Sequence, residues 1–223
     1  MFRIKICGIT SVADGLSVAR SGADAVGLNF CPTSPRQIDI PLAEEIVAAL
    51  PAGVARVGVF VNAPAAEVGR IARRLRLDYV QLHGDEPPEY LAELTGVPIV
   101  RAFRGTDDFR PVAAYLAACR ALGRAPAAVL VDAFQAGQYG GTGQSPDWSA
   151  IACARPAWGD LPLVLAGGLH PDNVATAIDQ VRPTAVDSAS GVESSPGRKS
   201  ADRVATFAAA ARAAFDQLVK SGR

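Results

Sequence analysis

Two patterns of hydrophobic and polar positions alternate along the chain. Short apolar runs rich in valine, isoleucine and phenylalanine are typical of strands, and we expect them at residues 3–7, 25–31, 55–61, 78–83, 98–103, 126–132, 162–166 and 184–189. The segments between them repeat alanine, leucine and arginine at helical spacing, and we expect helices at residues 11–21, 41–50, 64–75, 86–95, 109–122, 147–153, 171–180 and 200–219. Strands that alternate with helices pair in parallel, so the pattern predicts an α/β fold.

The number of strand–helix units indicates whether the sheet is a closed barrel or open. Eight units in 223 residues match the closed (β/α)8 barrel, in which eight parallel strands are each followed by a helix. The rival is an open doubly wound sheet, which normally carries a glycine-rich fingerprint directly after its first strand. Here the first strand runs into Cys7-Gly8-Ile9-Thr10, which lacks that fingerprint. We therefore predict a single-domain TIM barrel that spans residues 1–223.

Composition and charge exclude several classes of function. The 22 basic and 22 acidic residues cancel, whereas nucleic-acid-binding domains usually carry a basic excess, so we expect no nucleic-acid partner. No uncharged apolar stretch approaches the length of a membrane span, and the first residues lack the pattern of a signal peptide. Four cysteines without a C-x-x-C pair favour a reducing compartment, the cytoplasm. Two histidines argue against a multi-histidine metal site, and we expect neither metal nor cofactor.

Polar residues at the strand ends are the first candidates for chemistry, because barrel active sites lie at the carboxyl ends of the strands. Side chains alternate between the two faces of a strand, and the isoleucines of the first strand should face the helices, so Cys7 should point into the barrel mouth. By the same alternation Asp132, Gln81 and His83 point inward. A structural role is the alternative for each of these residues. Cys7 could be an inert packing residue, Asp132 could form a salt bridge inside the barrel, and His83 could form hydrogen bonds in the wall of the barrel mouth.

Glycine-rich segments after the last two strands predict a phosphate site. Gly167 and Gly168 end the seventh strand, Asn173 opens the next helix, and Ser190 with Gly191 follows the eighth strand. Barrels often hold a phosphate at these two loops, where backbone N–H groups can approach its oxygens. The alternative is that these glycines serve tight turns alone.

Two further loops contribute candidates. Arg36 stands in a proline-braced loop after the second strand, and arginine binds planar carboxylates or phosphates through two parallel hydrogen bonds. Gly141 belongs to Gly140-Gly141-Thr142-Gly143, in a loop of about 14 residues after the sixth strand; loops of that length in a compact domain are usually functional or disordered. The alternative for Arg36 is an ordinary surface arginine. The alternative for the glycine segment at 140–143 is a flexible loop without a function.

A series of motifs follows the predicted strands along the whole chain. They are KICGIT at 5–10, GLNFCPTSPR at 27–36, VGVFVN at 57–62, VQLHGDE at 80–86, the aspartate at 132, GGTG at 140–143, LAGGL at 165–169 with Asn173, and SGVE at 190–193. Together they resemble the motifs of the phosphoribosylanthranilate isomerase family of tryptophan biosynthesis. The match runs in order from the first strand to the loop after the eighth, so it covers essentially the entire chain.

The resemblance implies an Amadori rearrangement of N-(5'-phosphoribosyl)anthranilate to an aminodeoxyribulose phosphate, a small-molecule phosphosugar reaction without metal, nucleotide or redox carrier. It implies that Cys7 is the general base, that Asp132 is the general acid and that Arg36 contacts the anthranilate carboxylate. It places the phosphate at the two glycine loops. A thiol can act as base near neutral pH if its pKa falls below its ordinary value, and neighbouring Lys5 is one candidate source of such a shift.

Three other functions compete with this interpretation. A histidine-pathway or dual-substrate phosphoribosyl isomerase usually has an aspartate as first-strand base, where Cys7 stands here. A metal-dependent phosphosugar epimerase needs several histidine and aspartate ligands. A non-catalytic phosphosugar-binding barrel would have no reason to keep Cys7 together with Asp132. For the preferred function we expect a monomer.

Overall fold

Eight parallel strands close into a barrel in the computed structural model, which describes residues 1–104, 109–132 and 148–221. Each strand pairs with its neighbours in chain order, and β8 pairs with β1 to complete the barrel. The strands are β1 (Ile4–Cys7), β2 (Ala25–Asn29), β3 (Ala55–Phe60), β4 (Tyr79–Leu82), β5 (Ile99–Arg104), β6 (Ala128–Asp132), β7 (Leu163–Ala166) and β8 (Ala185–Ser188). The predicted TIM barrel is confirmed.

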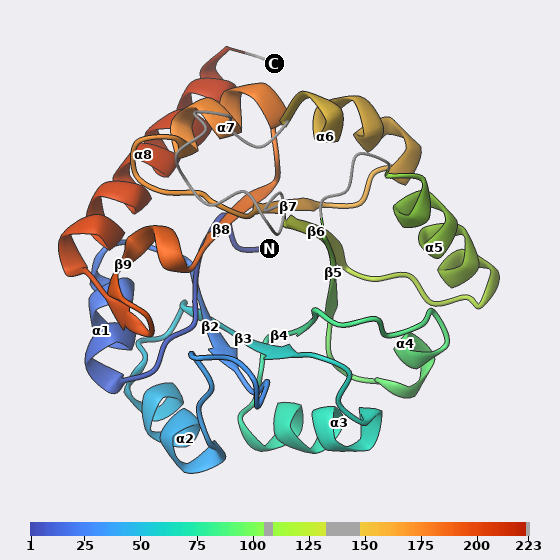
Figure 1. Ribbon diagram of the computed structural model, residues 1–223, viewed down its shortest axis with the longest axis horizontal. Helices are drawn as coiled ribbons and strands as arrows, with labels where there is room; N and C mark the ends of the chain where they lie inside the picture. The colour runs from blue at the N-terminus through green and yellow to red at the C-terminus, as the bar shows by residue number, and fades with distance from the viewer. Residues whose placement is uncertain (105–108, 133–147, 222–223) are drawn as a thin grey trace.

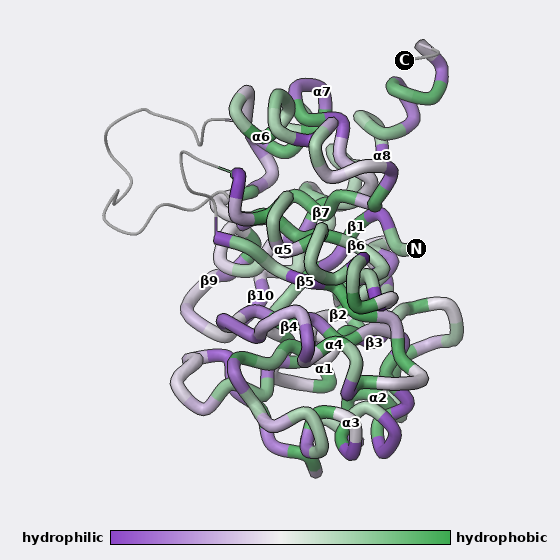
Figure 2. Tube along the Cα trace, turned by 90° about the vertical axis from the view of Figure 1, so that its right-hand side faces the viewer, coloured by the Kyte–Doolittle hydropathy of each residue, from purple (hydrophilic) through white to green (hydrophobic). Residues whose placement is uncertain are grey.

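The helices form a ring outside the strands (Figure 1). They are α1 (Val12–Arg20), α2 (Ile40–Ala49), α3 (Ala65–Arg74), α4 (Tyr90–Glu93), α5 (Arg110–Ala121), α6 (Trp148–Ala154), α7 (Val174–Val181) and α8 (Ala201–Lys220). Hydrophilic and hydrophobic residues alternate along helices such as α3 and α8 (Figure 2). This alternation lets each helix bury one face against the barrel and leave the other in water.

Three parts of the secondary structure differ from the prediction. The fourth helix is four residues long, although we expected 86–95. Pro88 disfavours a helical conformation at Pro87, and the Glu86 side chain accepts hydrogen bonds from the backbone N–H groups of Asn62 and Gly84. The second difference is a 3-10 helix, η2 (Ser190–Val192), followed by an antiparallel hairpin of β9 (Glu193–Ser195) and β10 (Arg198–Lys199). Another short 3-10 helix, η1 (Arg155–Trp158), follows α6.

The barrel has two apolar layers, as the alternation along the strands requires. Ile4 and Ile6 pack in the layer between strands and helices. The barrel interior is filled mainly by smaller side chains, including Ala25, Val57 and Ala128. The inward direction predicted for the alternate residues of β1 is confirmed at Lys5, which lies fully buried inside the barrel.

Candidate active site

Cys7 ends β1 beside a buried ion pair. Lys5, two residues earlier on the same face, donates to Oδ2 of Asp187 on β8 at 2.7 Å. Cys7 pairs in register with Gly27 of β2, where a Cβ atom would come within 2.6 Å of the Cys7 sulfur. A glycine at position 27 is therefore required for the thiol to occupy this place.

The electrostatics of Cys7 differ from the sequence-based expectation. Burial raises the pKa of the Cys7 thiol above its ordinary value, and the charge of Asp187 adds to this rise. Lys5 and, more weakly, Lys199 act in the opposite direction without cancelling it. The expectation that Lys5 lowers this pKa below its ordinary value is contradicted, because burial outweighs the Lys5 charge and Asp187, which pairs with the Lys5 ammonium, adds to the rise.

Asp132 ends β6 opposite a histidine held by a glutamine. Nε2 of His83 lies 3.8 Å from Oδ2 of Asp132, and Nδ1 of His83 lies 2.9 Å from the amide nitrogen of Gln81. Burial lowers the pKa of His83, against the opposing charge of Asp132. The imidazole is therefore neutral at pH 7, and its Nε2 faces Asp132.

Arg36 lies at the barrel mouth in a braced loop. The hydroxyl of Ser34 accepts from the Asn29 side chain and from the backbone N–H of Arg36, each at 3.1 Å. The guanidinium donates from Nε and Nη2 to the two carboxylate oxygens of Glu193, at 2.7 and 2.8 Å. These hydrogen bonds raise the pKa of Arg36. Position 36 is therefore part of an ion pair and not a solvated surface arginine.

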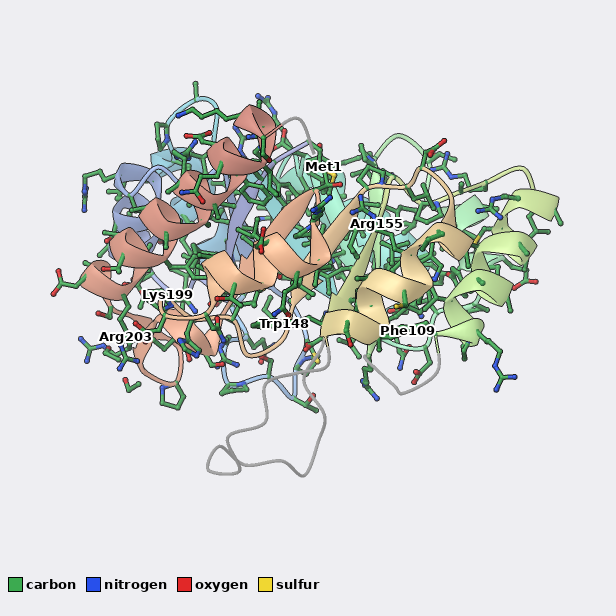
Figure 3. All side chains as sticks on the ribbon, turned by 90° about the horizontal axis from the view of Figure 1, so that it is seen from above. Met1, Phe109, Trp148, Arg155, Lys199 and Arg203 are labelled. Carbon is green, nitrogen blue, oxygen red and sulfur yellow. The ribbon has the colours of Figure 1, made fainter. Side chains whose placement is uncertain are left out.

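Sequence reasoning missed Glu193 and Lys199 as members of this site. Lys199 of β10 donates to Oε1 of Glu193 at 2.8 Å and to the carbonyl oxygen of Ala189 at 3.1 Å. Figure 3 shows Lys199 toward the same end of the barrel as Trp148, the first residue of α6, and Met1 toward the opposite end. Glu193 belongs to the recognised SGVE motif, but no local pattern connects it with an arginine 157 positions away.

The glycine loops after β7 and β8 lie against each other. Gly167 and Gly168 have φ angles of 88° and 65°, a left-handed conformation that favours glycine. The Ser188 hydroxyl of β8 donates to the carbonyl oxygen of Leu169 at 2.7 Å, and a Cβ atom at Gly191 would collide with that same carbonyl. The structure thus brings the two predicted phosphate loops together.

The remaining predicted residues of this region have distinct positions. The Asn173 side chain accepts from the His170 backbone N–H at 2.8 Å and donates to the Gly168 carbonyl at 3.0 Å, so it braces the loop. Helix α7 begins one residue later, at Val174. Ser190 starts η2 at the end of the eighth-strand loop. Gly141 lies outside the described residues.

Metal-binding clusters and membrane-spanning helices are both absent from the described residues. Among these residues, no group of three or more histidine, cysteine, aspartate and glutamate side chains is placed to hold a metal ion. Over the same part of the chain, no helix combines the length and the apolar character needed to cross a membrane.

Comparisons with known proteins give one consistent result. The sequence pattern of the family described as N-(5'phosphoribosyl)anthranilate (PRA) isomerase matches residues 4–210. The N-(5'-phosphoribosyl)anthranilate isomerase of Geobacter sulfurreducens is 47% identical over 209 residues, which are 93% of this chain and 97% of that protein. That of Pseudomonas aeruginosa strain PAO1 is 48% identical over 213 residues, 94% of this chain and 95% of that protein.

Solved structures agree with these relatives. The crystal structure of phosphoribosyl anthranilate isomerase from Thermotoga maritima has a TM-score of 0.83 and 40% identity, and the match covers 96% of this chain and 100% of that one. A second structure, of the enzyme in complex with reduced 1-(o-carboxyphenylamino)-1-deoxyribulose 5-phosphate, has a TM-score of 0.80 and 38% identity, with the same coverage. The chain therefore belongs to the N-(5'-phosphoribosyl)anthranilate isomerase family.

Proposed function

We propose that this protein catalyses the Amadori rearrangement of N-(5'-phosphoribosyl)anthranilate to 1-(2-carboxyphenylamino)-1-deoxyribulose 5-phosphate, a step of tryptophan biosynthesis. The observation that carries the proposal is the placement of Cys7 and Asp132 at the carboxyl ends of β1 and β6. These strands are separated by β7 and β8 on one side of the barrel and by four strands on the other. An acid and a base can thus act on one substrate from different sides.

In the first step Asp132 gives its proton to the furanose ring oxygen. The bond between that oxygen and C1 breaks, and the nitrogen lone pair forms a protonated imine at C1. His83 is neutral and 3.8 Å away, so it adds no positive charge that would oppose protonation of the carboxyl.

In the second step the Cys7 thiolate removes the proton from C2. The electrons of the C–H bond form the C1–C2 double bond of an enolamine, and the imine nitrogen becomes neutral. Tautomerisation then moves the enol proton to C1 and gives the ketone. Cys7 releases the proton it took to solvent and Asp132 takes one up, which restores both groups, so the overall reaction is an isomerisation. The raised pKa of Cys7 makes the thiolate scarcer at neutral pH and a stronger base whenever it forms.

The two ends of the substrate have separate binding groups in this proposal. Arg36 takes the anthranilate carboxylate, since its guanidinium lies at the same mouth as Cys7. The loops at Gly167, Gly168 and Ser190–Gly191 take the phosphate, because backbone without side chains allows an anion to approach closely. His83 and Gln81 form the wall beside Asp132. Gly141 is proposed to contact the substrate on the strength of the family motif alone.

We also propose that the protein is a cytoplasmic monomer with no nucleic-acid partner. All four cysteines are free thiols, which fits a reducing compartment, and the formal charges balance. Among the described residues the large apolar side chains that are exposed are Met1, Leu122 and Val219, on three separate segments. Analytical ultracentrifugation tests the monomer, and a predominant dimer at micromolar concentration would refute it.

The activity is tested by following the fluorescence of N-(5'-phosphoribosyl)anthranilate with purified protein. We expect its loss with saturation kinetics and formation of the ketose phosphate. A protein that binds the substrate without consuming it would be a phosphosugar-binding barrel. The same assay with the aminoaldose of histidine biosynthesis tests the dual-substrate alternative, for which we expect no turnover.

A further inference from the structure

We propose that Glu193 is a positioning residue that fixes the guanidinium of Arg36 for the substrate carboxylate and connects this group to the phosphate loop. The inference rests on the proposed role of Arg36 in binding the anthranilate carboxylate. Glu193 itself touches no reacting atom in this account. It acts through Arg36 on one side and through the segment around Ser190 on the other.

The first observation is the geometry of the ion pair. Glu193 holds the edge of the guanidinium formed by Nε and Nη2, at 2.7 and 2.8 Å. The Glu193 side chain is 5% exposed, whereas that of Arg36 is 22% exposed. A guanidinium has a second edge, formed by Nη1 and Nη2, that can also bind a planar carboxylate. Glu193 therefore directs the substrate to the terminal edge.

The location of this edge relative to the base is also fixed. The side chain of Arg36 lies over Gly8, the residue directly after Cys7, so closely that a Cβ atom at position 8 would clash with it. The backbone of Gly8 has a φ angle of 75°. The pair with Glu193 thus holds the carboxylate-binding group next to the base that must reach C2 of the same substrate.

The second observation is Lys199, which connects the pair to the phosphate loop. Its ammonium group bonds both Oε1 of Glu193 and the carbonyl oxygen of Ala189, and its side chain is 1% exposed. Ala189 directly precedes Ser190, and η2 leads directly into Glu193. One carboxylate therefore determines the placement of the groups for both substrate ends.

The charges of this cluster hold its members in place. Two cations, Arg36 and Lys199, face the carboxylate of Glu193, and burial lowers the pKa of Lys199 against the hydrogen bond to Glu193. Burial raises the pKa of Glu193, but the hydrogen bonds from Arg36 and Lys199 outweigh it, so the pKa lies below its ordinary value. Glu193 is therefore ionised at neutral pH and keeps the Arg36 guanidinium in its orientation.

A purely structural role makes different predictions. If Glu193 only anchored the β9–β10 hairpin, its loss would affect every substrate alike and would add to the loss of Arg36. If it positions Arg36, its effect needs both the substrate carboxylate and the arginine. Two measurements therefore decide between the roles. One is whether the effect of losing Glu193 depends on the substrate carboxylate, and the other is the energetic coupling between Glu193 and Arg36.

The test is Glu193→Gln, which keeps the shape of the side chain and removes its charge and one acceptor. With N-(5'-phosphoribosyl)anthranilate we expect KM to rise about tenfold or more, with a smaller change in kcat, because an Arg36 guanidinium that is no longer held in place binds the substrate carboxylate less tightly. With the analogue made from aniline, which lacks the carboxylate, we expect less than about a twofold change in KM. In an Arg36→Ala background, Glu193→Gln should add little.

A matched control is available in the exposed pair between Glu44 and Arg74. It has the same two-bond geometry, at 2.6 and 3.0 Å, and it joins the surfaces of α2 and α3. Glu44→Gln should leave both KM values unchanged. If Glu193→Gln does not fold, Glu193→Asp keeps the charge but shortens the reach, and the same substrate dependence is expected of it.

Equal losses with both substrates, or additive effects of Glu193→Gln and Arg36→Ala, would overturn the positioning role. An unchanged KM for the natural substrate would overturn it as well. Failure of the proposed function is distinguishable, because the wild-type protein would then leave N-(5'-phosphoribosyl)anthranilate unconsumed.

Discussion

The ammonium group of Lys5 lies 2.7 Å from Oδ2 of Asp187 inside the barrel, two residues along β1 from Cys7. Burial lowers the pKa of Lys5, but the charges of Asp187 and Cys7 outweigh it and hold this pKa above its ordinary value. Lys5 therefore stays charged, and its charge is shared between the two neighbours. This arrangement explains why burial dominates at Cys7, whose pKa is raised although a lysine stands beside it.

The first prediction concerns the pH dependence of the alkylation of Cys7 by iodoacetamide, which reacts with the thiolate. The thiolate fraction grows as pH rises toward the pKa of Cys7. Because that pKa is raised, the alkylation rate should still climb above the ordinary pKa of a thiol, about 8.5. A rate profile measured from pH 6 to 10, with the modified residue identified by peptide mapping, checks this, and a rate already constant below pH 7 would contradict it.

The same relationship predicts the effect of Asp187→Asn. Asp187 raises the pKa of Cys7, so its neutralisation should move the rising part of the profile to lower pH. Asp216→Asn, on the exposed face of α8, is the control and should leave the profile in place. A shift to higher pH in Asp187→Asn would mean that Lys5 had lost its proton and that the pair does not act as described.

His83 gives a third prediction. His83→Asn removes the imidazole 3.8 Å from Asp132 while retaining a polar side chain. We expect kcat to fall about tenfold, less than the usual contribution of a positioned acid or base, because the imidazole assists Asp132 without giving up the reacting proton. A loss as large as that of Asp132→Asn would instead assign proton transfer to the histidine.

The phosphate loop is tested by Gly168→Asp. Its carboxylate should repel the phosphate, and KM should rise strongly with little change in kcat. Backbone strain is controlled by Gly123→Asp, because Gly123 has nearly the same φ angle, 69° against 65°, and similarly open space around it. Gly168→Asn separates charge from shape and should be milder. An unchanged KM in folded Gly168→Asp would exclude the phosphate from this loop.

Much of the fold could be predicted because its signals are local. Strand and helix periodicities are visible within a few residues. Because successive side chains of a strand point to opposite faces, the isoleucines of β1 face the helices and Lys5 lies inside the barrel. The same alternation, applied to β6, gives the direction of Asp132. The short fourth helix was predicted too long, because Pro87 and Pro88 outweigh the apolar spacing around Leu91.

The features of the candidate site that sequence reasoning missed depend on contacts between segments that are distant in the chain. No pattern near Arg36 indicates that Glu193 occupies one edge of its guanidinium. Strands of three and two residues, such as β9 and β10, are too short to leave a periodic signal. The direction of the pKa shift at Cys7 follows first from burial, which the closed barrel creates. Asp187 adds to this rise, and it is 180 positions away in the chain and adjacent to Lys5 in the barrel.

The central claim is that Cys7 is the base and Asp132 the acid, and the most direct measurement is kcat of folded Cys7→Ala and Asp132→Asn. Each should lose roughly 10² to 10⁴ in kcat with little change in KM, because neither group binds the phosphate or the carboxylate. Cys153→Ala removes an exposed thiol and should retain full activity. Near-wild-type turnover of folded Cys7→Ala would contradict the account, because another group would then have to remove the C2 proton.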